Sequence, residues 1–308
     1  MAGRILRFFV KYIIYDMICG EEKPLENLTL SVCGKINLTL DVHYKRPDGY
    51  HEVEMIMQTI SLKDEISLKL IPRPVIELTS NCHKLPLDES NLAYKAAKLM
   101  IEKYKLDAGI AININKKIPI AAGLAGGSAD AAAVIVGINE MFQLNRPQEE
   151  LMALGKDIGA DVPFCIVGKT ALAKGIGEKI LPLKHLSGFG LLLVKPPYFV
   201  STKEVYSRLD VKAIQERPDT MAMIEYINAQ DIGKIAAGLC NVLEEVTFKL
   251  YPELDFIKKH LVSKGALGSL MSGSGPTVFG IFENIREAKN AAEKIDLAGN
   301  EIYVTQME

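Results

Sequence analysis

The sequence has few cysteines, and none of its five lies in a C-x-x-C pair. Cysteines that are odd in number and widely spaced fit neither a disulfide framework nor a zinc site. The histidines include no H-E-x-x-H pair, which argues against a catalytic metal held by histidine. We interpret the cysteines as buried thiols in a reducing, cytoplasmic compartment: Cys19, Cys33, Cys82, Cys165 and Cys240.

The sequence also lacks a strong charge of either sign and a long hydrophobic run. Its formal net charge is −2, which gives no reason to expect nucleic acid as a partner and favours a small ligand. In the apolar run after Arg7, the uncharged piece Tyr12 to Tyr15 is too short for a signal core or a membrane span. We interpret residues 1–26 as an extension, with a short helix as one option, that the chemistry does not need.

The length and composition predict a globular chain of two domains. Its 308 residues exceed the size of one hydrophobic core, and 48% hydrophobic with 24% charged residues is ordinary globular composition. Alternating apolar residues and turn residues predict a β-rich first third, and helical periodicity begins at Asn91. The expected strands there are 28–43, 52–61, 66–70, 75–78 and 110–114.

The middle of the chain combines a glycine-rich loop with helices. The segment 116–142 predicts a loop followed by a buried helix, since that helix is rich in Ala and Val and poor in charge. Pro147 near a helix start and Gly159 past its end predict the next helix, and 164–174 a strand.

Beyond residue 180 the pattern predicts an antiparallel sheet with helices on one face, an α+β arrangement. We therefore expect domains at 27–180 and 181–308. The elements expected in the second are strands at 190–195, 266–271, 277–282 and 301–306, helices within 202–264, and a helix from Asn284.

The glycine-rich loop is the strongest chemical signal. Gly123, Gly126 and Gly127 allow close approach of the backbone to a ligand, and the first N–H groups of a helix are unpaired donors at its positive end. This pattern predicts an anion site. The spacing matches neither the P-loop nor G-x-G-x-x-G. The residues alone leave open a tight turn with Ser128 as the helix N-cap, and Asp130 counts against phosphate unless it points away or faces a cation.

The run PIAAGLAGGSADAAA, residues 119–133, resembles the central motif of the GHMP kinase superfamily. Two further stretches match in the expected order, residues 35–38 and 271–277. Within the superfamily, GKINL, RPDGYH, GGSADAAA and GADVPF are together similar to the 4-diphosphocytidyl-2-C-methyl-D-erythritol kinases. The resemblance runs from about residue 29 to the end. It implies a two-domain GHMP kinase fold, with a β-rich α/β ATP-binding domain followed by a ferredoxin-like α+β domain.

The resemblance implies that Lys35 and Asp161 are the catalytic pair. Phosphoryl transfer needs a group that accepts the proton of the attacking hydroxyl and positive charge that offsets the developing negative charge. Without the resemblance, Asp161 reads as a solvated loop residue. Lys35 in an apolar strand is costly unless it is paired, and Asp161 would be a suitable partner.

The resemblance also implies a site for a cytidine diphosphate-linked substrate. Tyr50 and His51 would hold the cytosine, one by stacking and one by hydrogen bonding, and an aromatic ring and a donor and acceptor ring suit a flat polar base. Asn37 would position the substrate, and Tyr206 would supply a second ring or simply be a buried aromatic. Without the resemblance, residues 48–51 are interpreted as a hairpin turn with no role in binding. The glycine-rich loop 272–275 would close over the substrate or be a plain turn: Ser272, Gly273, Ser274 and Gly275.

ATP with Mg²⁺ is the expected phosphoryl donor, and Ser128 is the protein contact expected for the metal. One rival is another superfamily member acting on a mevalonate-like or sugar alcohol. A second rival, from a different class, is a catalytically silent sensor, which the presence of Lys35, Asp161 and the whole glycine loop disfavours. The residues expected to bind ATP are Asn91, Leu92, Pro119, Ala121, Ala122, Gly123, Leu124, Ala125, Gly126, Gly127 and Ser128.

Overall fold

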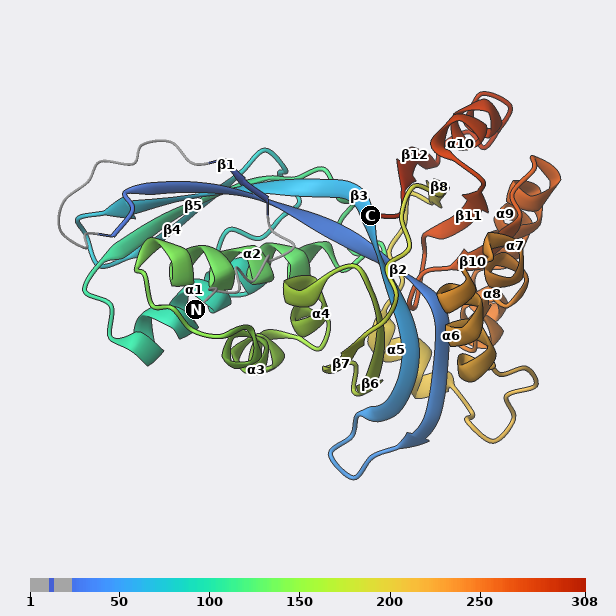
Figure 1. Ribbon diagram of the computed structural model, residues 1–308, viewed down its shortest axis with the longest axis horizontal. Helices are drawn as coiled ribbons and strands as arrows, with labels where there is room; N and C mark the ends of the chain where they lie inside the picture. The colour runs from blue at the N-terminus through green and yellow to red at the C-terminus, as the bar shows by residue number, and fades with distance from the viewer. Residues whose placement is uncertain (1–10, 14–23) are drawn as a thin grey trace. The chain divides into compact units, whose positions relative to one another are not determined.

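The computed structural model describes residues 11–13 and 24–308 (Figure 1). Its two longest strands, β2 (Asn27–Lys45) and β3 (His51–Ile71), are neighbours in a sheet of order β1-β2-β3-β5-β4. Contacts divide the described chain into two compact units, each assembled from several segments: the described residues up to 34, 63–120 and 126–168 in the first, and 35–62, 121–125 and 169–308 in the second. The domain boundary expected near residue 180 stays a prediction.

The first unit packs helices on a sheet. Helix α2 (Gly126–Met141) is buried along nearly its whole length, as the sequence predicts for a helix with so little charge. A Cβ at Gly137 would lie 2.4 Å from Leu68 and 2.8 Å from Leu30, so this glycine lets α2 lie close against β2 and β3. The other elements are β1 (Lys11–Ile13), β4 (Ile76–Ser80), β5 (Gly109–Asn115), α1 (Leu92–Tyr104), α3 (Gln148–Ile158) and α4 (Val162–Val167).

The second unit contains a four-stranded antiparallel sheet of order β10-β11-β8-β12 (Figure 1). Helix α9 packs on β10 and β11, and α10 packs on β8 and β12, which agrees with the α+β expectation. The strands are β6 (Thr170–Gly175), β7 (Lys179–Pro182), β8 (Gly190–Lys195), β9 (Cys240–Asn241), β10 (Gly268–Met271), β11 (Val278–Phe282) and β12 (Glu301–Gln306). The helices are α5 (Thr202–Arg208), α6 (Thr220–Ala229), α7 (Ile232–Ala237), α8 (Glu244–Leu250), α9 (Glu253–Ser263) and α10 (Ile285–Ala292).

Three local predictions are wrong. Residues 164–167 belong to helix α4 rather than to a strand, because Pro163 favours a first helical turn and Gly168, with φ 68°, ends the helix before β6 begins. The strands expected at 52–61 and 66–70 are one continuous strand, β3. Lys11–Ile13 is a strand paired with β2 rather than part of a helix, and the rest of the extension before residue 24 lies outside the described residues.

None of the helices in residues 24–308 is long and apolar enough to cross a lipid bilayer.

A buried charged cluster holds the start of α2 in the first unit. The Lys116 ammonium donates to Asp64 at 2.6 Å and to Asp130 at 2.7 Å. The second oxygen of Asp64 accepts the backbone N–H groups of residues 117 and 118, at 2.6 and 2.8 Å. A Cβ at Gly126 would lie 2.9 Å from the Lys116 nitrogen, so the ammonium lies directly against the first residue of α2. Asp130 therefore faces a cation, which answers the objection it raised against phosphate.

Burial raises the pKa of Asp130 from 3.8 to about 7, opposed by the Lys116 ammonium and reinforced by Asp64. The native state therefore holds this proton more tightly than the unfolded chain does, so stability from this group is present at acid pH and is lost as the pH rises toward about 7. Asp130→Asn cannot ionise. The variant should therefore gain stability relative to the parent, so that the difference between their free energies of unfolding shifts in its favour as the pH rises from about 4 to about 8 in urea titrations.

Asp88→Asn is the matched control. Hydrogen bonds from the Ser90 side chain and backbone lower the pKa of Asp88, so this group loses its stabilisation as the pH falls. Its difference from the parent should run in the opposite direction and appear at the acid end of the titration. Parallel pH curves for Asp130→Asn and the parent would contradict the assignment of a raised pKa to Asp130.

Candidate active site

The glycine-rich loop 121–125 has an unusual backbone. Ala121, Gly123 and Ala125 have positive φ angles of 50°, 76° and 56°, and the residues between them do not. Positive and negative φ angles thus alternate along the loop, and alternation of left-handed with right-handed residues is the pattern in which successive N–H groups can converge on an anion. A left-handed alanine costs roughly 1–2 kcal/mol, and strain of this kind gathers at functional sites. The phosphate prediction for this loop thus gains a geometric basis.

Strand β2 and the loop 272–275 hold this loop from two sides within the second unit. The Lys35 N–H donates to the Leu124 carbonyl at 3.0 Å, and the Ser272 hydroxyl donates to the Gly123 carbonyl at 2.9 Å. A Cβ at Gly123 would lie 2.2 Å from the Ser272 carbonyl oxygen, so no other residue fits without displacing the backbone. Both predicted glycine loops, 121–125 and 272–275, are therefore parts of one packed structure.

The side chains of Lys35 and Asn37 project from β2 beside these loops. Lys35 is 4% exposed, and its ammonium donates to the Asn37 amide oxygen at 2.9 Å. The Asn37 amide nitrogen in turn contacts the Met55 sulfur at 3.1 Å. The amide oxygen of Asn37 also lies 3.7 Å from the position of a Cβ on Gly273. The cost that the sequence assigns to a buried lysine is thus partly met by Asn37, and a pairing with Asp161 stays a prediction.

The sequence interpretation did not identify two residues that support the loop 272–275 from behind. The Asn241 amide donates to the Met271 and Gly273 carbonyls, both at 2.8 Å, and is 4% exposed. A Glu244 oxygen accepts the Met271 N–H at 2.8 Å, and burial raises the pKa of Glu244 against the opposing charge of Lys258. An asparagine directly before the apolar pair 242–243 is the signal that could have found this support.

The residues expected to hold the base lie at one end of β3 and on α5. The rings of His51 and Tyr206 are 5.1 Å apart and tilted by 38°. Burial, with a smaller effect of the Lys45 ammonium, lowers the pKa of His51, so its ring is neutral near pH 7 and both donates and accepts. Tyr50 is 60% exposed. The Thr202 and Ser274 hydroxyls are 2.8 Å apart, which links the start of α5 to the loop 272–275.

The first unit brings together the starts of two helices and the junction before α4. Asn91 caps α1 by accepting the Ala93 N–H at 2.9 Å, as its predicted position at a helix start implies. The Leu92 side chain lies 3.6 Å from a Cβ position on Gly127 and 4.0 Å from one on Gly159.

Ser128 is the third residue of α2 rather than its N-cap, because the helix begins two residues earlier. Its hydroxyl lies 3.8 Å from the Cβ position on Gly159. Asp161 occupies the N-cap position of α4 and makes no side-chain cap bond there. Within this unit, the expected adenine-flanking residue Leu92 and the expected metal contact Ser128 therefore lie near the junction that carries Asp161.

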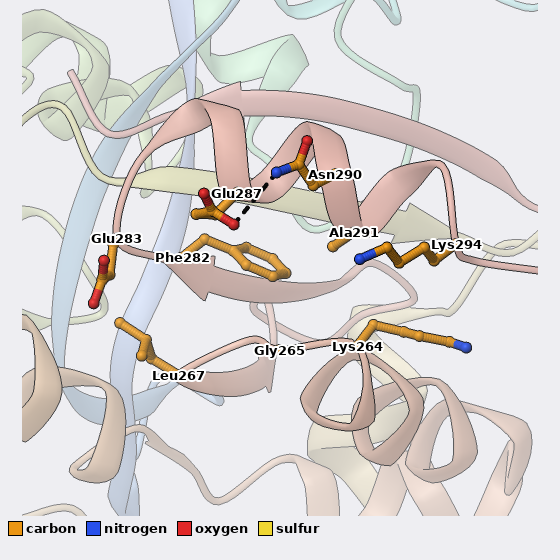
Figure 2. A pocket seen from close by; sticks show the side chains of 9 residues that line it. All are labelled: Lys264, Gly265, Leu267, Phe282, Glu283, Glu287, Asn290, Ala291 and Lys294. Carbon is orange, nitrogen blue, oxygen red and sulfur yellow. Dashed lines mark hydrogen bonds between the residues drawn. The ribbon is translucent and has the colours of Figure 1, made fainter.

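A pocket of about 260 Å³ lies elsewhere on the second unit (Figure 2). It is formed by residues 264–267, β11 and α10, and Figure 2 shows lysine and glutamate side chains on its rim around Phe282. None of the residues predicted for the reaction lines it. The predicted reaction therefore stays with the loops described above and not with this pocket, because a phosphoryl-transfer site needs converging donors on fixed backbone.

Models of the GHMP kinases N terminal domain and the GHMP kinases C terminal domain match residues 91–169 and 223–301. A 4-diphosphocytidyl-2-C-methyl-D-erythritol kinase of Acetivibrio thermocellus is 51% identical over 92% of this chain and 99% of the relative. The enzyme of that name from Clostridioides difficile is 45% identical over 91% of this chain and 95% of the relative.

Solved structures agree. A crystal structure of 4-(cytidine 5'-diphospho)-2C-methyl-D-erythritol kinase is 31% identical and gives a TM-score of 0.77 over 91% of this chain and 98% of the other. Homoserine kinase from Cytophaga hutchinsonii, at 19% identity and a TM-score of 0.74 over 95% and 98% of the two chains, shares the fold. The matches cover nearly the whole chain, which therefore belongs to the GHMP kinase family and, within it, to the 4-diphosphocytidyl-2-C-methyl-D-erythritol kinases.

Proposed function

We propose that this kinase transfers the γ-phosphate of ATP to a hydroxyl of 4-diphosphocytidyl-2-C-methyl-D-erythritol, forming the 2-phosphate in the non-mevalonate route to isoprenoid precursors. The observation that carries the proposal is the buried Lys35 beside a loop whose φ angles alternate in sign, as they do in an anion-binding nest. The substrate follows from relatives that bear this name and match the chain over about nine-tenths of its length.

The proposed chemistry is a direct in-line transfer without a phosphoenzyme. Asp161 accepts the proton of the attacking hydroxyl, and Lys35 offsets the negative charge that develops on the transferred group. In a buried site such a lysine acts with little screening by water, so its charge counts for more than on the surface. We propose the amides of residues 123–128, with Pro119, Ala121 and Ala122 before them and Asn91 and Leu92 at the adenine, as the ATP contacts.

Mg²⁺ is part of the proposal, because it neutralises the phosphates during transfer. Residues 24–308 contain no cluster of three acidic, histidine or cysteine side chains able to cage a metal. Mg²⁺ does not need such a cage, because it usually keeps several waters and takes substrate phosphates as ligands. The Ser128 hydroxyl is the protein contact we propose. The described cysteines, at 33, 82, 165 and 240, form no disulfide with one another, which suits the cytoplasmic location that we propose.

An ADP-release assay with a panel of alcohols tests the substrate. The panel contains 4-diphosphocytidyl-2-C-methyl-D-erythritol, mevalonate, homoserine and galactose. We expect turnover with the diphosphocytidyl compound to exceed turnover with the others. A higher kcat/KM for another alcohol would replace the proposed substrate, and ATP binding without turnover on any of them would favour the silent sensor.

Lys35→Ala and Asp161→Asn should each lower kcat by roughly 10²–10⁴-fold while the protein stays folded, because they remove the positive charge and the proton acceptor. Steady-state kinetics with circular dichroism measures both effects. The controls are Lys259→Ala and Asp255→Asn, which break an exposed ion pair of 2.5 Å on α9 and should leave turnover unchanged. A kcat close to that of the parent in either site variant would refute the assignment of Lys35 and Asp161 as the catalytic pair.

His51→Ala and Tyr50→Ala should raise KM for the diphosphocytidyl substrate by roughly 10–100-fold and leave KM for ATP unchanged, because they remove contacts to the base. Tyr44→Ala is the matched control, since Tyr44 is an equally exposed ring on the neighbouring strand β2. Equal effects on both KM values, or none, would mean that residues 50 and 51 do not read the base.

A further inference from the structure

The segment 209–219, between α5 and α6, contains neither helix nor strand. Irregular segments of this length adopt many conformations unless particular contacts hold them. Arg217 supplies such contacts. Its guanidinium donates to the Asp41 carboxylate at 2.5 Å, to the Val42 carbonyl at 3.0 Å and to the Val211 carbonyl at 2.8 Å. One side chain thus ties the beginning and the end of this segment to strand β2.

Asp41 belongs to the polar face of β2. Side chains two residues apart point to the same face of a strand, so Lys35, Asn37, Thr39 and Asp41 share one face, and all four are buried. Thr39 accepts the Ile56 N–H at 3.1 Å. Asp41 accepts the Val42 N–H at 2.7 Å and the guanidinium, with His43 Nδ1 at 3.8 Å from its other oxygen. The face that carries the proposed catalytic lysine therefore also carries the anchor of the segment 209–219.

Helix α5 is held at both of its ends. At its start, Thr202 is hydrogen-bonded to Ser274. After its end, Val211 is bound by Arg217. Tyr206 lies between these two points, on a helix of seven residues, and its ring faces His51. A helix this short has little stability of its own, so its position depends on tertiary contacts: the packing of its buried Val205 and the hydrogen bonds at its two ends.

We propose that Arg217, bound to Asp41, is a positioning residue for the base end of the substrate: it fixes α5 and thereby the distance between Tyr206 and His51. This inference rests on the proposed function, because it assigns these two rings to the substrate. The side chain of Asp41 is 9% exposed and that of Arg217 is 37% exposed, so the pair is screened less than a surface pair. Its two-pronged geometry needs a guanidinium rather than an ammonium.

The first test compares Arg217→Ala and Arg217→Lys in steady-state kinetics. Arg217→Ala should raise KM for the diphosphocytidyl substrate roughly tenfold, with KM for ATP and kcat changed less than about twofold. The substrate KM of Arg217→Lys should lie between those of Arg217→Ala and the parent, because lysine keeps the positive charge but lacks the two-pronged guanidinium. The control is Arg208→Ala, which breaks an exposed pair of 2.8 Å with Glu204 within α5 and should change neither KM.

The second test places Arg217→Ala in a Tyr206→Ala background. If Arg217 acts by placing Tyr206, the added rise in substrate KM should nearly vanish in that background, whereas additive effects overturn the proposal. The proposal is also overturned if Arg217→Ala lowers kcat and raises both KM values by similar factors while the thermal midpoint of Arg217→Lys falls as well, because a general loss of structure would then explain the effects. Failure of the proposed function is distinct, because then the parent itself does not turn over the diphosphocytidyl compound.

Discussion

The close approach of two backbones at Gly123 is the constraint on which the second unit's site depends. With a positive φ and a carbonyl oxygen where a Cβ would be, Gly123 fixes the distance between the loops 121–125 and 272–275. The carbonyls of Gly123 and Leu124 are occupied by Ser272 and Lys35, which leaves the loop little freedom to rotate. Strain at the two alanines is maintained because these contacts determine the conformation from both sides.

Buried polar groups fix the positions of Lys35, of the loop 272–275 and of the start of α2. The Lys35 ammonium donates to Asn37. The Asn241 amide nitrogen donates to two carbonyls, one just before the loop 272–275 and one within it. In the first unit, Lys116 is held between two carboxylates against the first residue of α2. A buried polar group that lacks its partners costs more than its hydrogen bonds contribute, so each of these networks has a single favourable arrangement. Such fixed arrangements suit a reaction that is catalysed by orientation and charge.

The sequence predicted the glycine loop, the buried α2, the helix that begins at Asn91 and the four strands of the C-terminal sheet, because these depend on nearby residues. It failed where the deciding contact is distant. β3 appeared to break at Lys63 and Asp64, but Asp64 is buried beside Lys116, 52 residues later. The pair of Arg217 and Asp41 spans 176 residues, and no periodicity reports it. The roles of the site residues and the domain boundary remain predictions, since neither the fold nor the family matches test them.

The proposed phosphate and base contacts differ in how they are distributed along the chain, and this difference has a physical origin. The phosphate contacts use backbone amides of one continuous segment, so they need only a particular chain conformation, and glycine and small residues suffice. The proposed base contacts need side-chain rings at set distances, and the chain supplies them from β3 and from α5. Ser274 holds the start of α5, and Arg217 holds the residues after its end. A homoserine kinase with 19% identity shares the fold. Changes in the elements that carry such rings can alter the substrate without disturbing the phosphate loop, whereas a side chain at Gly123 would disturb the loop in any member that packs its backbone this closely.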